Sequence, residues 1–153
     1  MLEQSFLDIY TKFKLQFYRK IFNRFESREA TLTAVETFCV EAIYALGQPT
    51  VNEFAHFVQI SPANAAYKVN NLIKKGYVIK ERSQADKREY HLLVTEKFMD
   101  YYGLSAGYVE VVSARIRKRF PKDDIQKLEQ ILKIVDEELM AELPSCKNPK
   151  PAD

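Results

Sequence analysis

Apolar side chains recur every third or fourth position along residues 2–25, and this spacing predicts one long amphipathic helix. No proline or glycine interrupts the segment, which would make about six helical turns. The apolar positions are Leu2, Phe6, Ile9, Phe13, Phe17, Ile21 and Phe25.

A second helix is predicted to begin at Thr33, because a threonine followed three residues later by Glu36 is the signature of a capping box. The helix is predicted to end at Gly47, where a glycine can adopt the left-handed conformation of a helix stop. The side chains predicted to face a core are Val35, Phe38, Cys39, Ala42, Ile43 and Leu46.

Two further helix starts follow closely. Thr50 with Glu53 repeats the capping box and predicts a short helix to about residue 57. Ser61 and Pro62 begin another helix as N-cap and first helical residue, and Gly76 ends it after Lys75. The predicted core side of residues 61–75 is Ala65, Val69, Leu72 and Ile73. The predicted outer side is Ala63, Asn64, Tyr67, Lys68, Asn71, Lys74 and Lys75.

A β-hairpin is predicted next, with strands at residues 77–82 and 89–94 around a charged tip of Asp86, Lys87 and Arg88. Two helices then follow at residues 95–120 and 122–143, separated by Pro121. The last helix carries an apolar stripe of Leu128, Ile131, Leu132, Val135, Leu139 and Leu143. Residues 144–153 contain three prolines and are predicted to be a disordered tail.

Charge is spread unevenly along the chain. The 153 residues carry a formal net charge of only +2, and the hydrophobic fraction of 46% is typical of a globular protein. Residues 61–91, however, hold seven basic and three acidic side chains. This local excess of positive charge is the pattern expected for a polyanion partner. No apolar run approaches the length of a membrane span, so we expect a cytoplasmic location without a membrane partner.

A short helix, a tight turn and a second helix that begins with proline form a helix-turn-helix, and the charged hairpin after it would be a wing. In such a unit the second helix enters the DNA major groove. Asn64 or Asn71 could read an adenine there, while Lys68 and Tyr67 are predicted to contact phosphates. We therefore predict double-stranded DNA as a partner, with Ser61, Ala63 and Lys74 completing the contact surface of the helix.

These stretches together resemble the MarR family of bacterial transcription regulators. The segments that carry the resemblance are LTAVETFCVEAI, TVNEFAHFVQISPANAAYKVNNLIKKGYVIKERS and DKREYHLLVT. Residues 2–143 are similar to the family in the order of their elements. The sequence departs from the family at Ala63 and Ala66, where many members have Ser or Thr, and at Tyr67, where a basic residue is common.

The resemblance implies a mostly α fold with a small β-wing: a winged helix-turn-helix flanked by N- and C-terminal dimerisation helices. The implied parts are an N-terminal dimerisation helix at residues 1–27, a DNA-binding domain at 30–96 and C-terminal dimerisation helices at 97–143. The wing arginine, here Arg88, would enter the minor groove, with Asp86 bracing it. The resemblance further implies a homodimer on a pseudo-palindromic operator, acting as a repressor that a small aromatic or amphipathic effector releases.

Several alternatives stay open. The winged unit could bind a protein or a small ligand without binding DNA. Phe13, Phe17 and Tyr44 could line an effector pocket or simply belong to a dimer core. Cys39 lies among apolar positions and is predicted to be a small core residue, with redox sensing as the alternative. We predict neither an enzyme nor a cofactor or metal site, because the sequence offers no Gly-rich phosphate loop, nucleophile motif or ligand spacing.

Overall fold

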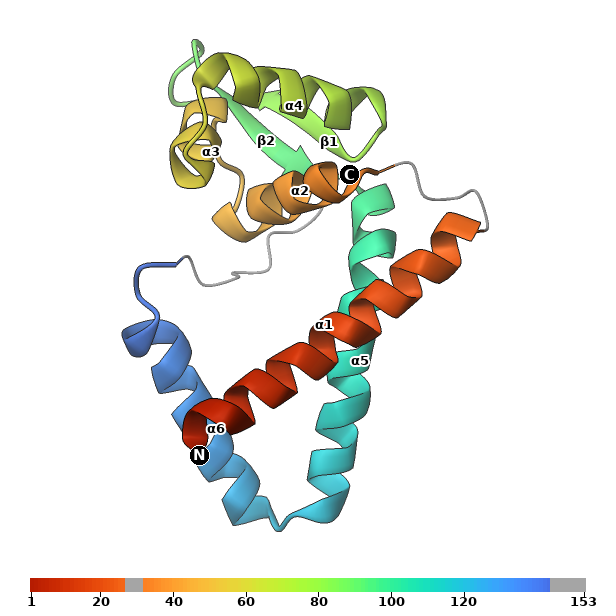
Figure 1. Ribbon diagram of the computed structural model, residues 1–153. Coiled ribbons are helices and arrows are strands. Elements are labelled where there is room, and N and C mark those ends of the chain that lie inside the picture. Colours follow the sequence, from red (N-terminus) through yellow and green to blue (C-terminus); the bar gives the residue numbers. More distant parts are fainter. Residues whose placement is uncertain (27–31, 144–153) are drawn as a thin grey trace. The chain divides into compact units, whose positions relative to one another are not determined.

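The structure of the protein is a computed structural model that describes residues 1–26 and 32–143 (Figure 1). The chain divides into two compact units. One unit comprises residues 1–31 and 101–136, and the other comprises residues 32–100 with the segment from residue 137 onward. The predicted tail at 144–153 lies outside the described residues. Each unit is considered separately below.

The winged unit contains helices α2 (Ala34–Leu46), α3 (Val51–Val58) and α4 (Pro62–Lys74), strands β1 (Val78–Arg82) and β2 (Tyr90–Val94), and the start of α5 (Glu96–Arg119). The strands form a two-stranded antiparallel sheet in which Val78 pairs with Val94 and Arg82 pairs with Tyr90. Helix α3 packs on α4, and both α2 and α4 contact the sheet. The mostly helical fold with a small β-wing is thus confirmed.

Local side-chain caps fix the starts of these helices. Thr33 and Glu36 form both hydrogen bonds of a capping box, as do Thr50 and Glu53. The Ser61 hydroxyl accepts a hydrogen bond from the backbone N–H of Asn64 at 3.2 Å. All three caps are the ones predicted from the sequence. Such caps satisfy N–H groups that a helix leaves without an intrahelical partner, which contributes about 1 kcal/mol each.

Gly76 ends the fourth helix in a left-handed conformation, with φ of 81°. Its N–H donates to the carbonyl of Ile73, and the N–H of Tyr77 donates to the carbonyl of Leu72. A side chain at position 76 would be strained by this φ. The chain can therefore reverse sharply from α4 into β1.

The hydrophobic core of the winged unit draws on every one of its elements. Each large apolar side chain in it contributes about 1.5–3 kcal/mol when it is fully buried. The fully buried side chains include Val40, Ile43, Pro49, Phe54, Ala65, Val69, Leu72, Val78, Leu92 and Phe98. The predicted core positions Ala65, Val69 and Leu72 are confirmed, while Ile73 is half-buried.

The predicted core face of α2 is wrong at its start. Val35 is 51% exposed and Phe38 is 61% exposed. The face that meets the core instead runs through Thr37, Val40 and Tyr44, which lie three and four residues apart and so share one side of the helix. Because α2 is apolar on more than one side, the sequence pattern alone did not decide between these faces.

The second unit is built from α1 (Leu2–Glu26), the remainder of α5 and α6 (Lys122–Ile134). The helix predicted at residues 122–143 is confirmed over most of its length, but it ends at Leu139. The α-helix ends at Ile134 and gives way to a π-helical turn at Val135–Leu139. Apolar spacing of three or four residues cannot distinguish a π turn from an α turn over so few residues.

The apolar stripe of α1 is covered only in part. Phe13, Phe17 and Ile21 are half-buried, while Phe6 and Ile9 remain 50% and 56% exposed. The Phe13 ring meets Tyr108 edge-on with 5.5 Å between ring centroids, and Phe17 meets Tyr101 at 6.4 Å. These two aromatic pairs join α1 to α5 within this unit.

Candidate nucleic-acid interface

The outer face of α4 presents polar side chains in the arrangement that the sequence predicts. Ala65, Val69 and Leu72 anchor the helix, so positions between them must point outward. Asn64 and Tyr67 are exposed, with 67% of Tyr67 accessible, whereas Lys68 and Asn71 are half-buried. The remaining predicted contact residues of this helix are exposed as well: Ser61, Ala63 and Lys74.

The wing tip is a folded turn. The backbone N–H of Ser83 donates to the carbonyl of Glu89, and the N–H of Glu89 donates to the carbonyl of Asp86. The N–H of Asp86 in turn donates to the Ser83 hydroxyl. These bonds give the tip a defined shape between the two strands.

Asp86 holds Arg88 at this tip. One carboxylate oxygen of Asp86 accepts hydrogen bonds from the backbone N–H of Arg88 at 3.0 Å and from its Nε at 3.3 Å. The bracing that the resemblance implies is therefore present. The Arg88 side chain is still 91% exposed, and Lys87 beside it is exposed too. A guanidinium whose Nε is already bonded keeps its terminal N–H groups available for an outside acceptor.

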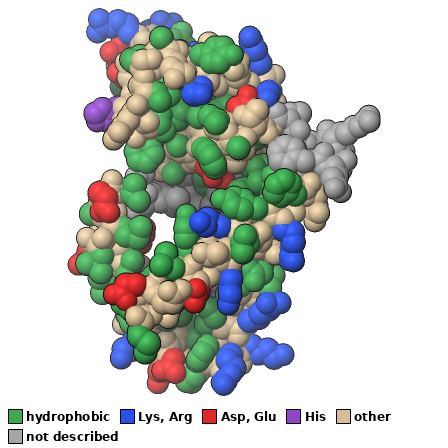
Figure 2. Space-filling view, in the orientation of Figure 1, with side chains coloured by type: hydrophobic (Ala, Val, Ile, Leu, Met, Phe, Trp, Pro, Cys, Tyr) green, Lys and Arg blue, Asp and Glu red, His purple; other side chains and the backbone are tan. Residues whose placement is uncertain are grey.

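Basic side chains of the winged unit lie along part of its outer edge (Figure 2). The space-filling view shows Lys and Arg side chains in blue along the edge where α4 and the wing loop lie in Figure 1 (Figure 2). A cleft of about 400 Å³ separates the wing from the start of α3. Its lining is formed by Thr50, Val51, Asn52, Glu53, Lys80, Arg88, Glu89 and Tyr90.

This cleft could not be found from the sequence, because it depends on a tertiary contact. Thr50 forms a β-bridge with His91, and the N–H of Leu92 donates to the carbonyl of Pro49 at 2.8 Å. Together these contacts bring the start of α3 to the wing. No local pattern indicates that residues 41 positions apart will pair.

Lys75 is predicted from the helical spacing to lie on the outer face of α4, and this is wrong. Its Nζ lies 2.7 Å from Oε2 of Glu36 in α2. The spacing of α4 put position 75 among the outward residues, but the helix ends at Lys74 and the chain turns there. Lys75 is therefore turned toward α2 instead of continuing the row of Lys68 and Lys74.

The three aromatic residues predicted to line an effector pocket do not all belong to one unit. Phe13 and Phe17 belong to the unit of α1, whereas Tyr44 is buried in the winged unit against Phe98, with 5.4 Å between ring centroids. An effector site at these residues stays a prediction.

Cys39 is a buried core residue with 7% of its surface exposed. Burial raises the pKa of its thiol, an effect that the charge of Lys68 opposes only in part. A raised pKa keeps the thiol protonated and unreactive. Across residues 1–26 and 32–143, no group of three or more His, Cys, Asp or Glu side chains is placed to hold a metal ion. None of the described helices combines the length and the apolar run that a membrane span requires.

Comparison with solved structures gives similar folds for nearly the whole chain. A transcriptional regulator from Thermotoga maritima aligns with a TM-score of 0.61 at 20% identity, over 92% of this chain and 94% of the other. A mutant of MepR from S. aureus aligns with a TM-score of 0.66 at 14% identity, over 92% and 98%. FabT of Streptococcus pneumoniae in complex with DNA aligns with a TM-score of 0.56 at 17% identity, over 92% and 96%.

Comparison with curated proteins gives no match. The sequence model of the MarR family, in contrast, matches residues 32–90. That range runs from the residue before the Thr33 cap to the first residue of β2, so it contains α2, α3, α4 and the wing tip. Residues 32–90 of this chain therefore match the MarR family model, and this is the family that the sequence resembles.

Proposed function

We propose that the protein is a sequence-specific DNA-binding transcription regulator, with α4 in the major groove and Arg88 in the adjacent minor groove. The observation that carries the proposal is the pairing of an exposed polar face on α4 with an exposed arginine whose direction Asp86 fixes. A narrow minor groove has a strongly negative potential that attracts a guanidinium. The similar fold of FabT, which was solved in complex with DNA, supports this assignment.

The base-reading and phosphate-binding roles follow from side-chain chemistry. Asn64 is exposed near the start of α4 and can donate to and accept from the edge of one adenine. The ammonium groups of Lys68, Lys74 and Lys87 are compact positive charges suited to phosphates. The hydroxyl of Tyr67 can also donate a hydrogen bond to a phosphate oxygen. Asn71 lies two helical turns after Asn64 and is half-buried, which leaves Asn64 the better placed of the two.

The proposed active form is a homodimer, with residues 1–27 and 97–143 as dimerisation helices. Helix α6 buries no side chain in the described chain, and Ile131 and Leu132 are each 49% exposed. Leu2, Phe6 and Ile9 on α1 are likewise at least half exposed. Exposed apolar surface on this scale is typical of an interface with another chain. Figure 2 shows hydrophobic side chains among the charged ones over these helices.

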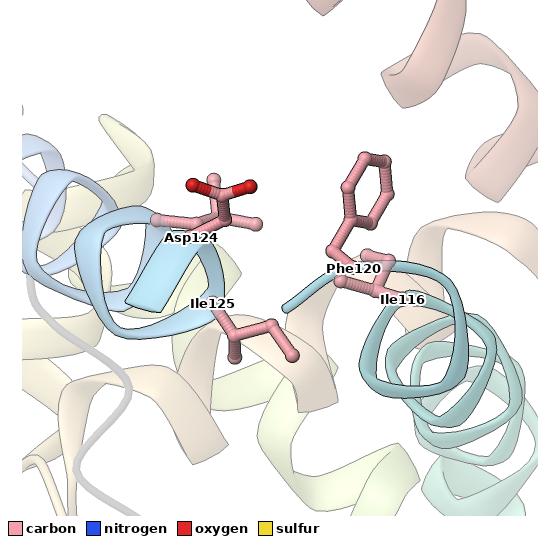
Figure 3. Close-up of a pocket in the computed structure, with 5 residues that line it drawn as sticks. Ile116, Phe120, Asp124 and Ile125 are labelled. Carbon is pink, nitrogen blue, oxygen red and sulfur yellow. The ribbon is translucent and has the colours of Figure 1, made fainter. Parts of the chain in front are cut away.

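An open apolar cavity at the turn between α5 and α6 supports the same proposal. Its volume is about 280 Å³, and Ile116 and Phe120 lie opposite Asp124 and Ile125 across it (Figure 3). Leu128 completes the lining. A second copy of the chain could fill such a cavity with an apolar side chain and so bury surface that a monomer leaves in water.

A dimer with two-fold symmetry presents two copies of α4 to the DNA. We therefore propose a pseudo-palindromic operator with half-sites about one helical turn apart. A dimer seated on a promoter would block transcription, so repression is the proposed outcome. An aromatic or amphipathic effector would relieve it by favouring a different dimer geometry.

Selection of bound sequences from a pool of random duplexes tests the proposal. The expected result is enrichment of a pseudo-palindrome, with a bound species containing two chains per duplex. Failure to enrich any motif, with the folded protein recovered unbound, would favour a winged unit that binds a small ligand or a protein instead of DNA.

A further inference from the structure

The end of α4 is tied to the start of α2 by a half-buried ion pair. The distance from Lys75 Nζ to Glu36 Oε2 is 2.7 Å, and the two side chains are 32% and 13% exposed. Glu36 also accepts a hydrogen bond of 2.8 Å from the backbone N–H of Thr33. The carboxylate of Glu36 thus bonds both the capping box of α2 and Lys75, the residue that follows the last residue of α4.

The first turn of α5 reaches the same point. Lys97 Nζ donates to the carbonyl oxygen of Lys75 at 2.7 Å and lies 4.6 Å from the centre of the Tyr77 ring. The Thr95 hydroxyl donates to the carbonyl of Gly76 at 2.6 Å. Carbonyls at a helix C-terminus lack intrahelical partners and carry partial negative charge, so a lysine is well suited to cap them.

We propose that Lys97 and Lys75 form a clamp that sets the direction of α4 relative to α5. Both are then positioning residues for DNA recognition, although neither needs to touch DNA. The inference rests on the proposed function above. Its physical basis is that three helices meet at one residue, Lys75. Its side chain bonds Glu36 of α2, and its backbone carbonyl accepts a hydrogen bond from Lys97 of α5.

The clamp has a consequence for the spacing of the operator. Helix α5 begins in the winged unit and continues into the unit proposed to dimerise. In a dimer, the direction of α4 relative to the first turn of α5 therefore contributes to the distance between the two recognition helices. Loosening the clamp should relax the preference for one half-site separation.

The simpler explanation is that Lys97 and Lys75 are ordinary surface cations that contribute little, as most exposed ion pairs do. A second explanation is that Lys97 is a direct phosphate contact. The three explanations differ in measurable ways. A phosphate contact alters the salt dependence of binding and acts equally at every spacing, whereas a positioning residue alters the preference among spacings.

The test measures affinity for a set of duplexes in which two enriched half-sites are moved apart one base pair at a time. The chains compared are the parent, Lys97→Met, Lys97→Arg and Lys74→Met. Methionine keeps the unbranched stem of lysine but removes the donor, while arginine keeps both donor and charge. Lys74 is the control, because it lies beside Lys75 at the end of α4 and is proposed to contact phosphate directly.

The parent should prefer one spacing. Lys97→Met should lose about tenfold at that spacing, within the range seen for residues that act on binding without touching the ligand, and should show a flatter profile across the others. Lys97→Arg should restore the parent profile. Lys74→Met should weaken binding by the same factor at every spacing and lower the salt dependence.

The clamp is refuted if Lys97→Met keeps the parent affinity and profile, or if it behaves like Lys74→Met. Thermal unfolding of each variant is measured first, and Lys97→Ala, which also removes the donor, replaces the methionine variant if that one does not fold. If the parent protein binds no duplex, the proposed function itself is overturned. If the parent binds and the Lys97→Met variant binds in the same way, only the clamp is overturned.

Discussion

Arg88 and Asp86 are joined at the wing tip by two hydrogen bonds to the same carboxylate oxygen, one from the backbone N–H and one from Nε of the arginine. Their side chains are 91% and 44% exposed, so the pair is open to solvent and contributes little to stability. What the carboxylate does is limit the directions in which the guanidinium can point. The guanidinium of Arg88 is therefore both exposed and limited in direction.

Replacement of Arg88 should lower DNA affinity while leaving the stability of the fold nearly unchanged. Arg88→Ala removes a charge from an exposed tip, so the free energy of unfolding should change by less than about 0.5 kcal/mol. DNA affinity should fall for every operator variant, and the preference for A·T-rich flanks should shrink, because a minor-groove arginine senses groove width. Fluorescence anisotropy with flank-varied duplexes measures both effects. Parental affinity in this variant would show that the wing does not enter the groove.

Replacement of Asp86 tests the brace itself. Asp86→Ala leaves Arg88 charged but free to take other directions, so its affinity should lie between those of the parent and Arg88→Ala. The double variant should bind like Arg88→Ala alone, since the aspartate acts through the arginine. If the two losses add in full, Asp86 has a role that does not depend on Arg88.

Asn64→Ala should weaken the preference of the protein for one base in the half-site. A bidentate contact to the correct base is worth about 1–3 kcal/mol of discrimination, so affinity should fall by this amount for the preferred half-site and little for half-sites altered at that base. Titration of the variant against duplexes with single half-site substitutions gives the comparison. An equal loss for all half-sites would reassign Asn64 to a phosphate contact and leave base reading to Tyr67, Lys68 or Asn71.

Local signals were enough to predict the helix boundaries of the winged unit. Thr33, Thr50 and Ser61 act on backbone groups three residues away, and Gly76 acts through its own φ, so each effect is contained in a short stretch of sequence. The outward positions of α4 followed from the helical period once its three anchors were identified. The wing pair was anticipated from the family resemblance, not from spacing alone.

Long-range pairing was not predictable in the same way. Nothing near Lys75 in the sequence points to Glu36, which lies 39 residues away, or to Lys97, which lies 22 residues away. Val35 and Phe38 were placed in the core because they are apolar, although the packing of α2 leaves both exposed. Such choices depend on which face meets its neighbours, and a single amphipathic pattern does not contain that information.

The Glu36–Lys75 pair predicts a particular pH dependence of stability. Burial raises the pKa of Glu36, but hydrogen bonds from Lys75 and Thr33 and the charge of Lys75 outweigh it, so the pKa lies below the ordinary value of 4.5. A depressed carboxyl pKa stabilises the fold fully above the unfolded-state pKa, and this stability is lost as the pH falls through the folded-state pKa.

The parent should therefore be more stable than Glu36→Gln at neutral pH, and the difference should shrink as the pH drops below about 4.5. Urea unfolding at a series of pH values measures it. Glu53→Gln is the matched control, because Glu53 occupies the same capping-box position in α3. A difference between parent and Glu36→Gln that stays constant down to pH 3 would contradict the assignment.

Helix α6 should tolerate a charge only where it faces solvent in the dimer. Ile131→Glu places a carboxylate in the exposed apolar stripe and should convert the dimer to monomers, as measured by light scattering at micromolar concentration. Lys127→Glu alters the charge of the same helix at a polar position and should leave the dimer intact. A parent protein that is already monomeric under these conditions would contradict the proposed assembly.

Cys39 should be nearly inert in the folded protein. In the variant Cys146→Ser, Cys39 is the single thiol of the chain. Burial and a raised pKa should slow its reaction with a disulfide reagent at pH 8 far below that of a free thiol, and urea should restore the rate. Rapid labelling of the native protein would instead support a redox role for Cys39.

The salt dependence of DNA binding tests the central claim most directly. Anisotropy titrations of one enriched duplex and one scrambled duplex are carried out at several salt concentrations with the parent protein. Basic contacts to phosphate release counterions, so the logarithm of affinity should fall steeply and linearly with the logarithm of salt for both duplexes, while the enriched duplex binds more tightly throughout. Equal affinity for the two duplexes, or binding that salt does not weaken, would contradict the account.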